Sequence, residues 1–295
     1  MSDLTRFDHW MAQALYGPRG YYTSPRPLLG FRGDFTTTPK TSPLLAQKLA
    51  EMVGACPVIE LGPGDGTLAE DLRTSLGFWK RHQLDYHFVE ISPHLRERQR
   101  ERFGCRAGWH DTLAEALEVV GGEALILSNE FFDAFPARIF QDGRELYLDQ
   151  KGGEHWQPCP RLPEAEALSP SHSWPPGQRL EVLETVHEWY QTQLSGFRKG
   201  RMVTVDYGGQ IHDLYHRRPG GTLRAYFHHQ RLYPPEAYAN PGHQDLTTDV
   251  CFDDLRQWGE AAGLQTLSLQ NQASFLGLSD RSAEAAFQVL VQEKT

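Results

Sequence analysis

The chain has 295 residues, of which 39% are hydrophobic and 23% are charged, and its formal net charge at pH 7 is -9. This composition is ordinary for a globular protein and excludes a disordered or fibrous chain. The negative charge, with no block of Lys and Arg, argues against a nucleic-acid partner. At this length we expect one large α/β domain, or a core that carries a substantial insertion.

Cysteine usage and the N-terminus bear on the compartment. The four cysteines lie far apart and form no C-x-x-C, which argues against a disulfide framework and against a cysteine zinc site. No apolar run approaches the roughly 20 residues that span a bilayer. Residues 1–8 carry acidic side chains and no hydrophobic signal core. We therefore predict a cytoplasmic protein without a membrane span.

Residues 1–56 are predicted to form an extension that packs on the core. Apolar side chains from Phe7 to Leu15 recur at helical spacing, which indicates a short amphipathic helix. The segment 21–43 is rich in Gly, Pro and Thr and also holds aromatic residues, so we expect a structured loop. A second helix is predicted over 44–53.

From residue 57 to residue 295, short apolar segments alternate with segments of helical character. This alternation predicts a Rossmann-like α/β core with a mostly parallel central sheet. The stretch 151–180 differs, because glycines, prolines and two tryptophans indicate a loop or small insertion. The predicted strands are 58–61, 86–91, 124–129, 202–207, 266–269 and 286–291; the predicted helices are 67–76, 180–194 and 252–262, with Pro93 opening another.

A glycine loop follows the first core strand directly. Gly62, Gly64 and Gly66 would let the backbone approach a ligand closely, and the amides at the start of a helix favour polar or anionic groups. The dinucleotide fingerprint G-x-G-x-x-G needs a glycine where Thr67 stands. Glu60, immediately before the loop, suits the cationic amino group of a methionine moiety and would not help a pyrophosphate.

Polar side chains also end the next two strands. Glu90 lies where an acid can accept hydrogen bonds from ribose hydroxyls, and Asn129 ends the strand 124–129. Both NAD and S-adenosylmethionine (SAM) carry such a ribose, so Glu90 alone favours neither. The pairing of Glu60 with G-x-G-x-G favours SAM. The alternative is a tight turn whose strand-end acids merely face solvent.

Five further segments resemble one family. They are G-D-F-T-T-T-P at 33–39, S-N-E-F-F-D-A-F-P at 128–136, D-Y-G at 206–208, G-T-L-R-A-Y at 221–226 and P-G-H-Q-D-L-T at 241–247. With the glycine loop they match, in order, the MidA / mitochondrial complex I assembly factor 7 family of SAM-dependent methyltransferases. The resemblance covers residues 16–277.

This resemblance implies a class I methyltransferase fold and SAM as cofactor, with S-adenosylhomocysteine as product. For the mitochondrial relatives it also implies symmetric dimethylation of an arginine on a respiratory complex I subunit. Lys40 stands where the family usually has glutamate. That departure lies outside the SAM site and bears on the substrate, which is predicted to be a protein.

Three acids are candidates for the chemistry of an arginine acceptor. Glu130 and Asp133 follow a parallel strand at the edge where such sheets bind ligands. We expect Glu130 to orient the acceptor and Asp133 or Asp206 to assist, since carboxylates can bind a guanidinium bidentately and accept its proton. The alternative is that these acids satisfy loop amides and cap the next helix.

Other motifs allow two interpretations each. Gly33 and Asp34 could form a lid over the cofactor or a rigid turn on the core. Asp111 could border the adenine or lie in a surface loop. The H-x-x-x-H spacing of residues 212–216 lacks a third ligand, so we predict no metal site. The two adjacent histidines at 228–229 indicate a polar loop that could face the substrate.

The leading hypothesis is therefore a SAM-dependent protein methyltransferase acting on arginine. The alternatives are a SAM-binding assembly factor that mainly holds a partner protein, and a small-molecule methyltransferase. An NAD-dependent oxidoreductase comes last, because the third fingerprint glycine is missing.

Overall fold

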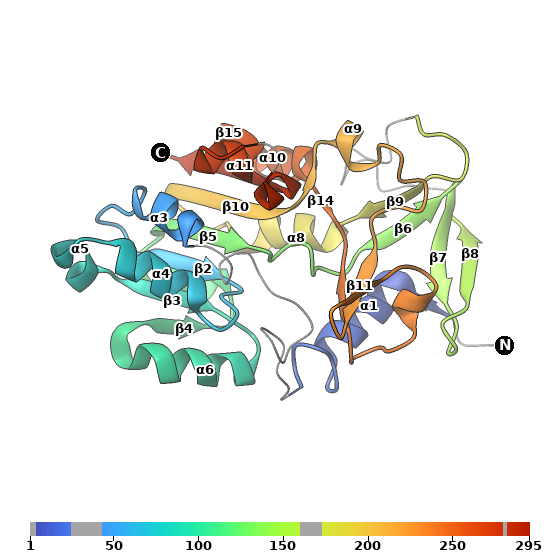
Figure 1. The fold of residues 1–295 in the computed structure, drawn as a ribbon, viewed down its shortest axis with the longest axis horizontal. Helices are drawn as coiled ribbons and strands as arrows, with labels where there is room; N and C mark the ends of the chain where they lie inside the picture. The colour runs from blue at the N-terminus through green and yellow to red at the C-terminus, as the bar shows by residue number, and fades with distance from the viewer. Residues whose placement is uncertain (1–3, 25–42, 160–172, 280–281) are drawn as a thin grey trace.

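The computed structural model describes residues 4–24, 43–159, 173–279 and 282–295. Within these residues the central sheet has eight strands in the order β15-β16-β10-β5-β2-β3-β4, with β14 beside β10 (Figure 1). Neighbours from β10 to β4 are parallel, whereas β15, β16 and β10 pair antiparallel. The strands are β2 (Val58–Leu61), β3 (Tyr86–Val89), β4 (Gly108–His110), β5 (Glu123–Asn129), β10 (Lys199–Gly209), β14 (Val250–Cys251), β15 (Gln265–Asn271) and β16 (Phe287–Lys294).

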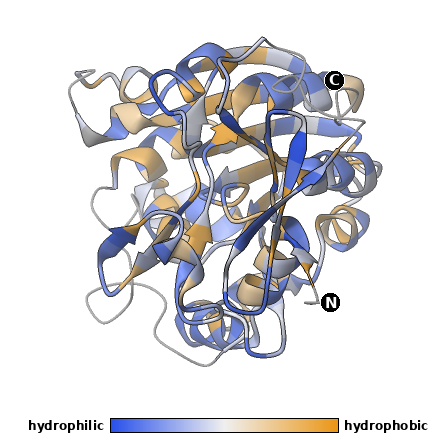
Figure 2. Cartoon of the chain, turned by 90° about the vertical axis from the view of Figure 1, so that its right-hand side faces the viewer, coloured by the Kyte–Doolittle hydropathy of each residue, from blue (hydrophilic) through white to orange (hydrophobic). Residues whose placement is uncertain are grey.

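Helices cover both faces of this sheet because its central strands are apolar on both sides. β2 is buried along its whole length, and its alternate side chains enter two different hydrophobic clusters. One cluster includes α3 (Leu44–Ala50), α4 (Thr67–Ser75) and α11 (Gln272–Leu276); the other includes α7 (Leu113–Val119), α8 (Glu184–Gln193) and α10 (Phe252–Ala261). Figure 2 shows hydrophobic and hydrophilic colours mixed along both the strands and the helices.

A second, five-stranded antiparallel sheet lies beside the core. It contains β1 (Thr5–Arg6), β6 (Arg138–Gln141), β7 (Arg144–Leu148), β8 (Glu154–Pro158) and β9 (Arg179–Val182). The helix α1 (Phe7–Tyr16) shares a hydrophobic cluster with this sheet through Phe7, Met11 and Leu15, all fully buried. Within the stretch 151–180, predicted to be a loop or a small insertion, the residues of β8 form a strand that pairs with β7.

The predicted helix 180–194 was also wrong in its first part. Its residues before Leu183 form β9, which pairs with β6 and buries Leu180 and Val182. A short apolar segment is compatible with a strand or a helix, and here the pairing with β6 makes it a strand. The other predicted helices and strands are confirmed, and their ends differ from the predicted ones by up to three residues. The structure also contains the helices α5 (Phe78–Gln83), α6 (Pro93–Phe103) and α9 (Ile211–Leu214).

A three-stranded antiparallel sheet, absent from the sequence prediction, stands in front of the carboxyl edge of the central sheet. Its strands are β11 (Arg224–Phe227), β12 (Gln230–Leu232) and β13 (Asp245–Thr247), in the order β12-β11-β13. Together with α1 it extends the molecule beyond the ends of β2, β3 and β5 (Figure 1).

Gly208 lets β10 pair with β14. Its φ is +149°, and a Cβ there would lie 2.0 Å from the carbonyl oxygen of Val250. We expect Gly208→Ala to lower the free energy of unfolding by about 3 kcal/mol, measured by urea denaturation. Gly143→Ala is the control, because its φ is also positive (+72°) but no atom lies within 4 Å of the added Cβ. Equal losses in the two variants would show that the contact with Val250 contributes nothing.

Candidate active site

A cavity of about 710 Å³ opens at the carboxyl ends of β2, β3 and β5. This is the edge at which open parallel sheets bind ligands. Its walls come from the glycine loop, the residues after β5, α1 and the small sheet β11–β13. Eight of the residues predicted from the sequence line it: Glu60, Gly62, Gly64, Glu90, Asp111, Asn129, Glu130 and Asp133.

The other predicted residues have different positions. Gly33 and Asp34 lie outside the described residues. Gly66 does not line the cavity; its φ is +80°, and a Cβ there would meet the ring of Phe103 at 2.8 Å. Asp206 does not line the cavity either, and its side chain is fully buried.

The Asp206 carboxylate holds the turn that follows β5. Its Oδ2 accepts hydrogen bonds from the backbone N–H groups of Phe131 (3.2 Å), Phe132 (2.9 Å) and Asp133 (3.4 Å). Burial, with the nearby charges of Asp133 and Glu130, raises the pKa of Asp206 well above its usual range. This arrangement corresponds to the alternative in which the acid satisfies loop amides.

The glycine loop brings backbone to the cavity in a conformation that side chains disfavour. Gly62 and Gly64 have φ values of +58° and +56°. A Cβ on Gly62 would lie 2.8 Å from the ring of Phe131. The loop therefore requires glycine for its backbone conformation and, at Gly62, for space.

Two buried acids flank this loop. Glu60 accepts a hydrogen bond from the hydroxyl of Tyr86 (2.7 Å), and Glu90 accepts one from the backbone N–H of Ser92 (2.8 Å). Burial raises the pKa of each carboxyl to about 7, an effect that these hydrogen bonds oppose. A cationic ligand would stabilise their charged forms.

Asn129 adds an acceptor at the same end of the cavity. Its Nδ2 donates to Glu130 Oε1 (3.2 Å), while its buried Oδ1 has no hydrogen-bond partner among the described residues. A buried acceptor without a partner is costly unless a ligand supplies a donor. Asn129 and Glu60 would accept from an amino group and Glu90 from ribose hydroxyls, so the residues present fit SAM.

The opposite end of the cavity holds residues to which the sequence assigned no role. The Tyr22 hydroxyl donates to Asp245 Oδ1 (2.9 Å), and the Thr247 hydroxyl donates to Asp133 Oδ2 (2.7 Å). Burial, followed by the charge of Asp133, raises the pKa of Asp245 to about 8. Asp245 and Thr247 belong to the motif 241–247, and this motif was the only feature of the sequence that pointed to them as site residues.

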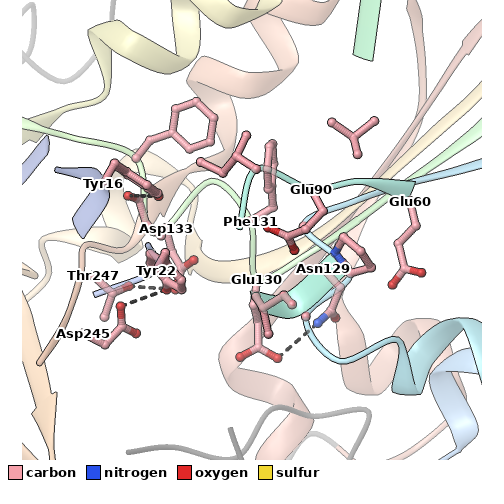
Figure 3. Close-up of a pocket in the computed structure, with 18 of the residues that line it drawn as sticks. Tyr16, Tyr22, Glu60, Glu90, Asn129, Glu130, Phe131, Asp133, Asp245 and Thr247 are labelled. Carbon is pink, nitrogen blue, oxygen red and sulfur yellow. Dashed lines mark hydrogen bonds between the residues drawn. The ribbon is translucent and has the colours of Figure 1, made fainter. Parts of the chain in front are cut away.

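Figure 3 shows how the two ends are arranged. Glu130, which has the left-handed φ of +50° at the end of β5, lies between them together with Phe131. Such backbone conformations in non-glycine residues cluster at functional sites. On one side lie Glu60, Glu90 and Asn129; on the other lie Tyr16, Tyr22, Asp133, Asp245 and Thr247.

The described residues bear on two other classes of site. They contain no group of three or more His, Cys, Asp or Glu side chains that could hold a metal ion. No helix within the described ranges is both long enough and apolar enough to cross a membrane.

Over residues 44–270 the chain matches the model of a family described as "Putative S-adenosyl-L-methionine-dependent methyltransferase". It is 30% identical over 303 residues to "Protein arginine methyltransferase NDUFAF7 homolog, mitochondrial" of Drosophila melanogaster, covering 86% of this chain and 66% of that protein. It is 28% identical to the Mus musculus protein of the corresponding name, covering 90% of this chain and 69% of the relative. The chain thus spans about two thirds of these relatives' length.

Solved structures agree with the family match. A protein from Burkholderia thailandensis bound to S-adenosyl-homocysteine has a TM-score of 0.82 and 28% identity, covering 99% of this chain and 88% of its own. A second structure from that organism has a TM-score of 0.78 and 26% identity. The family model covers well over half of the chain, and the α/β fold agrees with these structures. The chain therefore belongs to the MidA / complex I assembly factor 7 family of SAM-dependent methyltransferases, with SAM as its cofactor.

Proposed function

We propose that this chain transfers the methyl group of SAM to the guanidinium of an arginine in a partner protein, such as a respiratory complex I subunit. The observation that supports this most is the cavity end opposite the glycine loop, where carboxylates and tyrosines face the same space. Asp133 and Asp245 are held there by the hydroxyls of Thr247 and Tyr22. The names of the relatives as protein arginine methyltransferases support the same acceptor.

The chemistry explains why an arginine acceptor needs such acids. SAM supplies an electrophilic methyl group on a sulfonium, and the leaving sulfur becomes neutral. Alignment of the acceptor nitrogen with that methyl group can contribute about 7–11 kcal/mol. A guanidinium has a pKa above about 12 and is a poor nucleophile while protonated. Carboxylates beside it can orient the nitrogen and accept the proton that it loses.

The described residues can be given roles on this basis. Glu130, between the two ends of the cavity, would orient the reacting nitrogen. Asp133 and Asp245 would bind the far side of the guanidinium and accept the proton. Asp206 would act as a positioning residue through the backbone of 131–133. Asp111, at the cofactor side, would border the adenosyl group.

The pH dependence of acceptor binding follows from Asp245. Because its pKa is about 8, the Asp245 carboxyl carries a proton at neutral pH when no guanidinium is bound. A bound guanidinium favours the charged carboxylate. We therefore expect kcat/KM for an arginine peptide, at saturating SAM, to rise with pH and level off above about 8. Asp245→Asn should remove this limb of the profile. An identical profile in the variant would exclude Asp245 as its source.

The acceptor class can be tested with two peptides that differ only in having arginine or lysine at one position. The purified chain is incubated with each peptide and SAM carrying a trideuterated methyl group, and the products are fragmented in a mass spectrometer. We expect label on the arginine side chain and none on lysine. Label on lysine, or no label in either peptide while SAM still binds, would contradict the proposal.

A further inference from the structure

The hairpin between β11 and β12 has an unusual turn. Phe227 pairs with Gln230, so His228 and His229 form a two-residue loop, with φ values of +47° and +63°. A loop of this kind strongly favours Asn-Gly or Asp-Gly, because both residues need a positive φ. The hairpin between β6 and β7 follows that rule with Asp142 and Gly143, at +50° and +72°. Two adjacent histidines in the same conformation depart from this preference, and non-glycine residues with such conformations cluster at functional sites.

This hairpin carries an arginine to the mouth of the cavity. Tyr226 pairs with Arg231 on one side and with Asp245 on the other, so the three residues form one row across the small sheet. Directly paired residues project on the same face, and all three line the cavity. The guanidinium of Arg231 lies 5.6 Å from the ring centroid of Tyr226. The row thus runs from the buried Asp245 to the exposed Arg231.

The charge of Arg231 contrasts with the rest of the lining. Among the described residues around the cavity, Arg231 is the one lysine or arginine. Its side chain hydrogen-bonds to the tyrosines Tyr233 and Tyr226. His229 lines the cavity beside it and is also exposed. An arginine at the mouth would not help the cavity to bind a cation. It would help the cavity to bind a ligand group that carries a negative charge. The acids of the lining are Glu60, Asp65, Glu90, Asp111, Glu130, Asp133 and Asp245.

We propose that Arg231 and His229 bind a carboxylate that the substrate protein carries close to the arginine that is methylated. The inference rests on the proposed function and narrows its substrate class to arginines with an acidic neighbour. Adjacent strands are about 4.8 Å apart, so the row spans roughly 10 Å from Asp245 to Arg231. An extended chain covers that distance in about three residues. Arg231 is therefore a specificity-determining residue, outside the reacting atoms.

The test uses arginine peptides with one Glu, Gln or Lys placed within about four residues of the arginine. For the wild type at saturating SAM we expect the Glu peptide to have a kcat/KM about tenfold higher than the Gln peptide, at the position where the effect is largest. The Lys peptide should have a lower kcat/KM than the Gln peptide. Arg231→Gln should make the Glu and Gln peptides equal. Arg144→Gln is the matched control, an exposed arginine beside the Asp142–Gly143 turn and away from the cavity, and should keep the preference.

A second variant separates the turn's function from its folding. His228→Asn/His229→Gly should raise Tm by about 2 °C, because it suits the left-handed turn, and should weaken the preference for Glu. The SAM dissociation constant should not change in either variant. A weaker SAM affinity in Arg231→Gln with the Glu preference intact would assign the arginine to the cofactor carboxylate and overturn the inference. If Arg231→Gln retains the preference while arginine methylation continues, the inference alone fails; if no arginine peptide is methylated, the proposed function fails.

Discussion

Replacing Glu130 with glutamine is expected to reduce methyl transfer to an arginine peptide by about 10³-fold and to leave the SAM dissociation constant nearly unchanged. Glu130 lies between the cofactor end and the acceptor end of the cavity, with a left-handed backbone conformation that directs it there. Glutamine keeps the size of the side chain but removes the charge that orients the guanidinium. The measurement is a single-turnover rate at saturating SAM, with calorimetric titration of SAM.

Glu123→Gln is the matched control. Glu123 lies in the same strand, β5, but at its exposed opposite end, so its replacement should leave both the rate and the affinity unchanged. Unchanged turnover in Glu130→Gln would remove Glu130 from the chemistry. A parallel loss of SAM affinity would instead place Glu130 at the cofactor.

Gly64→Arg is expected to weaken SAM binding by more than about 100-fold while the protein stays folded. Gly64 lines the cavity with a φ of +56°, so a side chain there is strained and projects beside the loop that must approach the ligand. Titration of SAM and of S-adenosylhomocysteine by calorimetry measures the loss, and circular dichroism checks the fold.

Gly77→Arg provides the control for a glycine-to-arginine change. Gly77 precedes α5, has an ordinary φ of -62°, and a Cβ there meets no atom within 4 Å. We expect this variant to bind SAM as the wild type does. Full SAM affinity in Gly64→Arg would mean that the cofactor does not contact the glycine loop.

The central sheet was predictable because its signals are local. The segment Val58–Leu61 is apolar, short and followed at once by glycines, which is typical of a buried parallel strand that leads into a ligand loop. The second sheet was not predictable in the same way. The sequences of β9 (R-L-E-V) and β8 (E-H-W-Q-P) are not apolar runs, unlike that of β2. β9 also depends on β6, a partner about 40 residues earlier in the chain.

The two ends of the site differ for a similar reason. Glu60, Glu90 and Asn129 follow strands of one parallel sheet, so their meeting at one edge can be deduced from the strand pattern. The contact of Tyr22 with Asp245 joins residues 223 positions apart, across α1 and the small sheet, and no local pattern encodes it. Asp206 was expected near Glu130, but only the structure shows that backbone amides occupy its carboxylate.

The most direct measurement is a crystal structure of the chain with S-adenosylhomocysteine and an arginine peptide. We expect the sulfur to face the guanidinium, with Glu60 and Glu90 in contact with the cofactor product. Glu130 and Asp245 should contact the guanidinium. A guanidinium bound outside the cavity, or an adenosyl group beside Tyr22 and Asp245, would contradict the assignment of a cofactor end and an acceptor end.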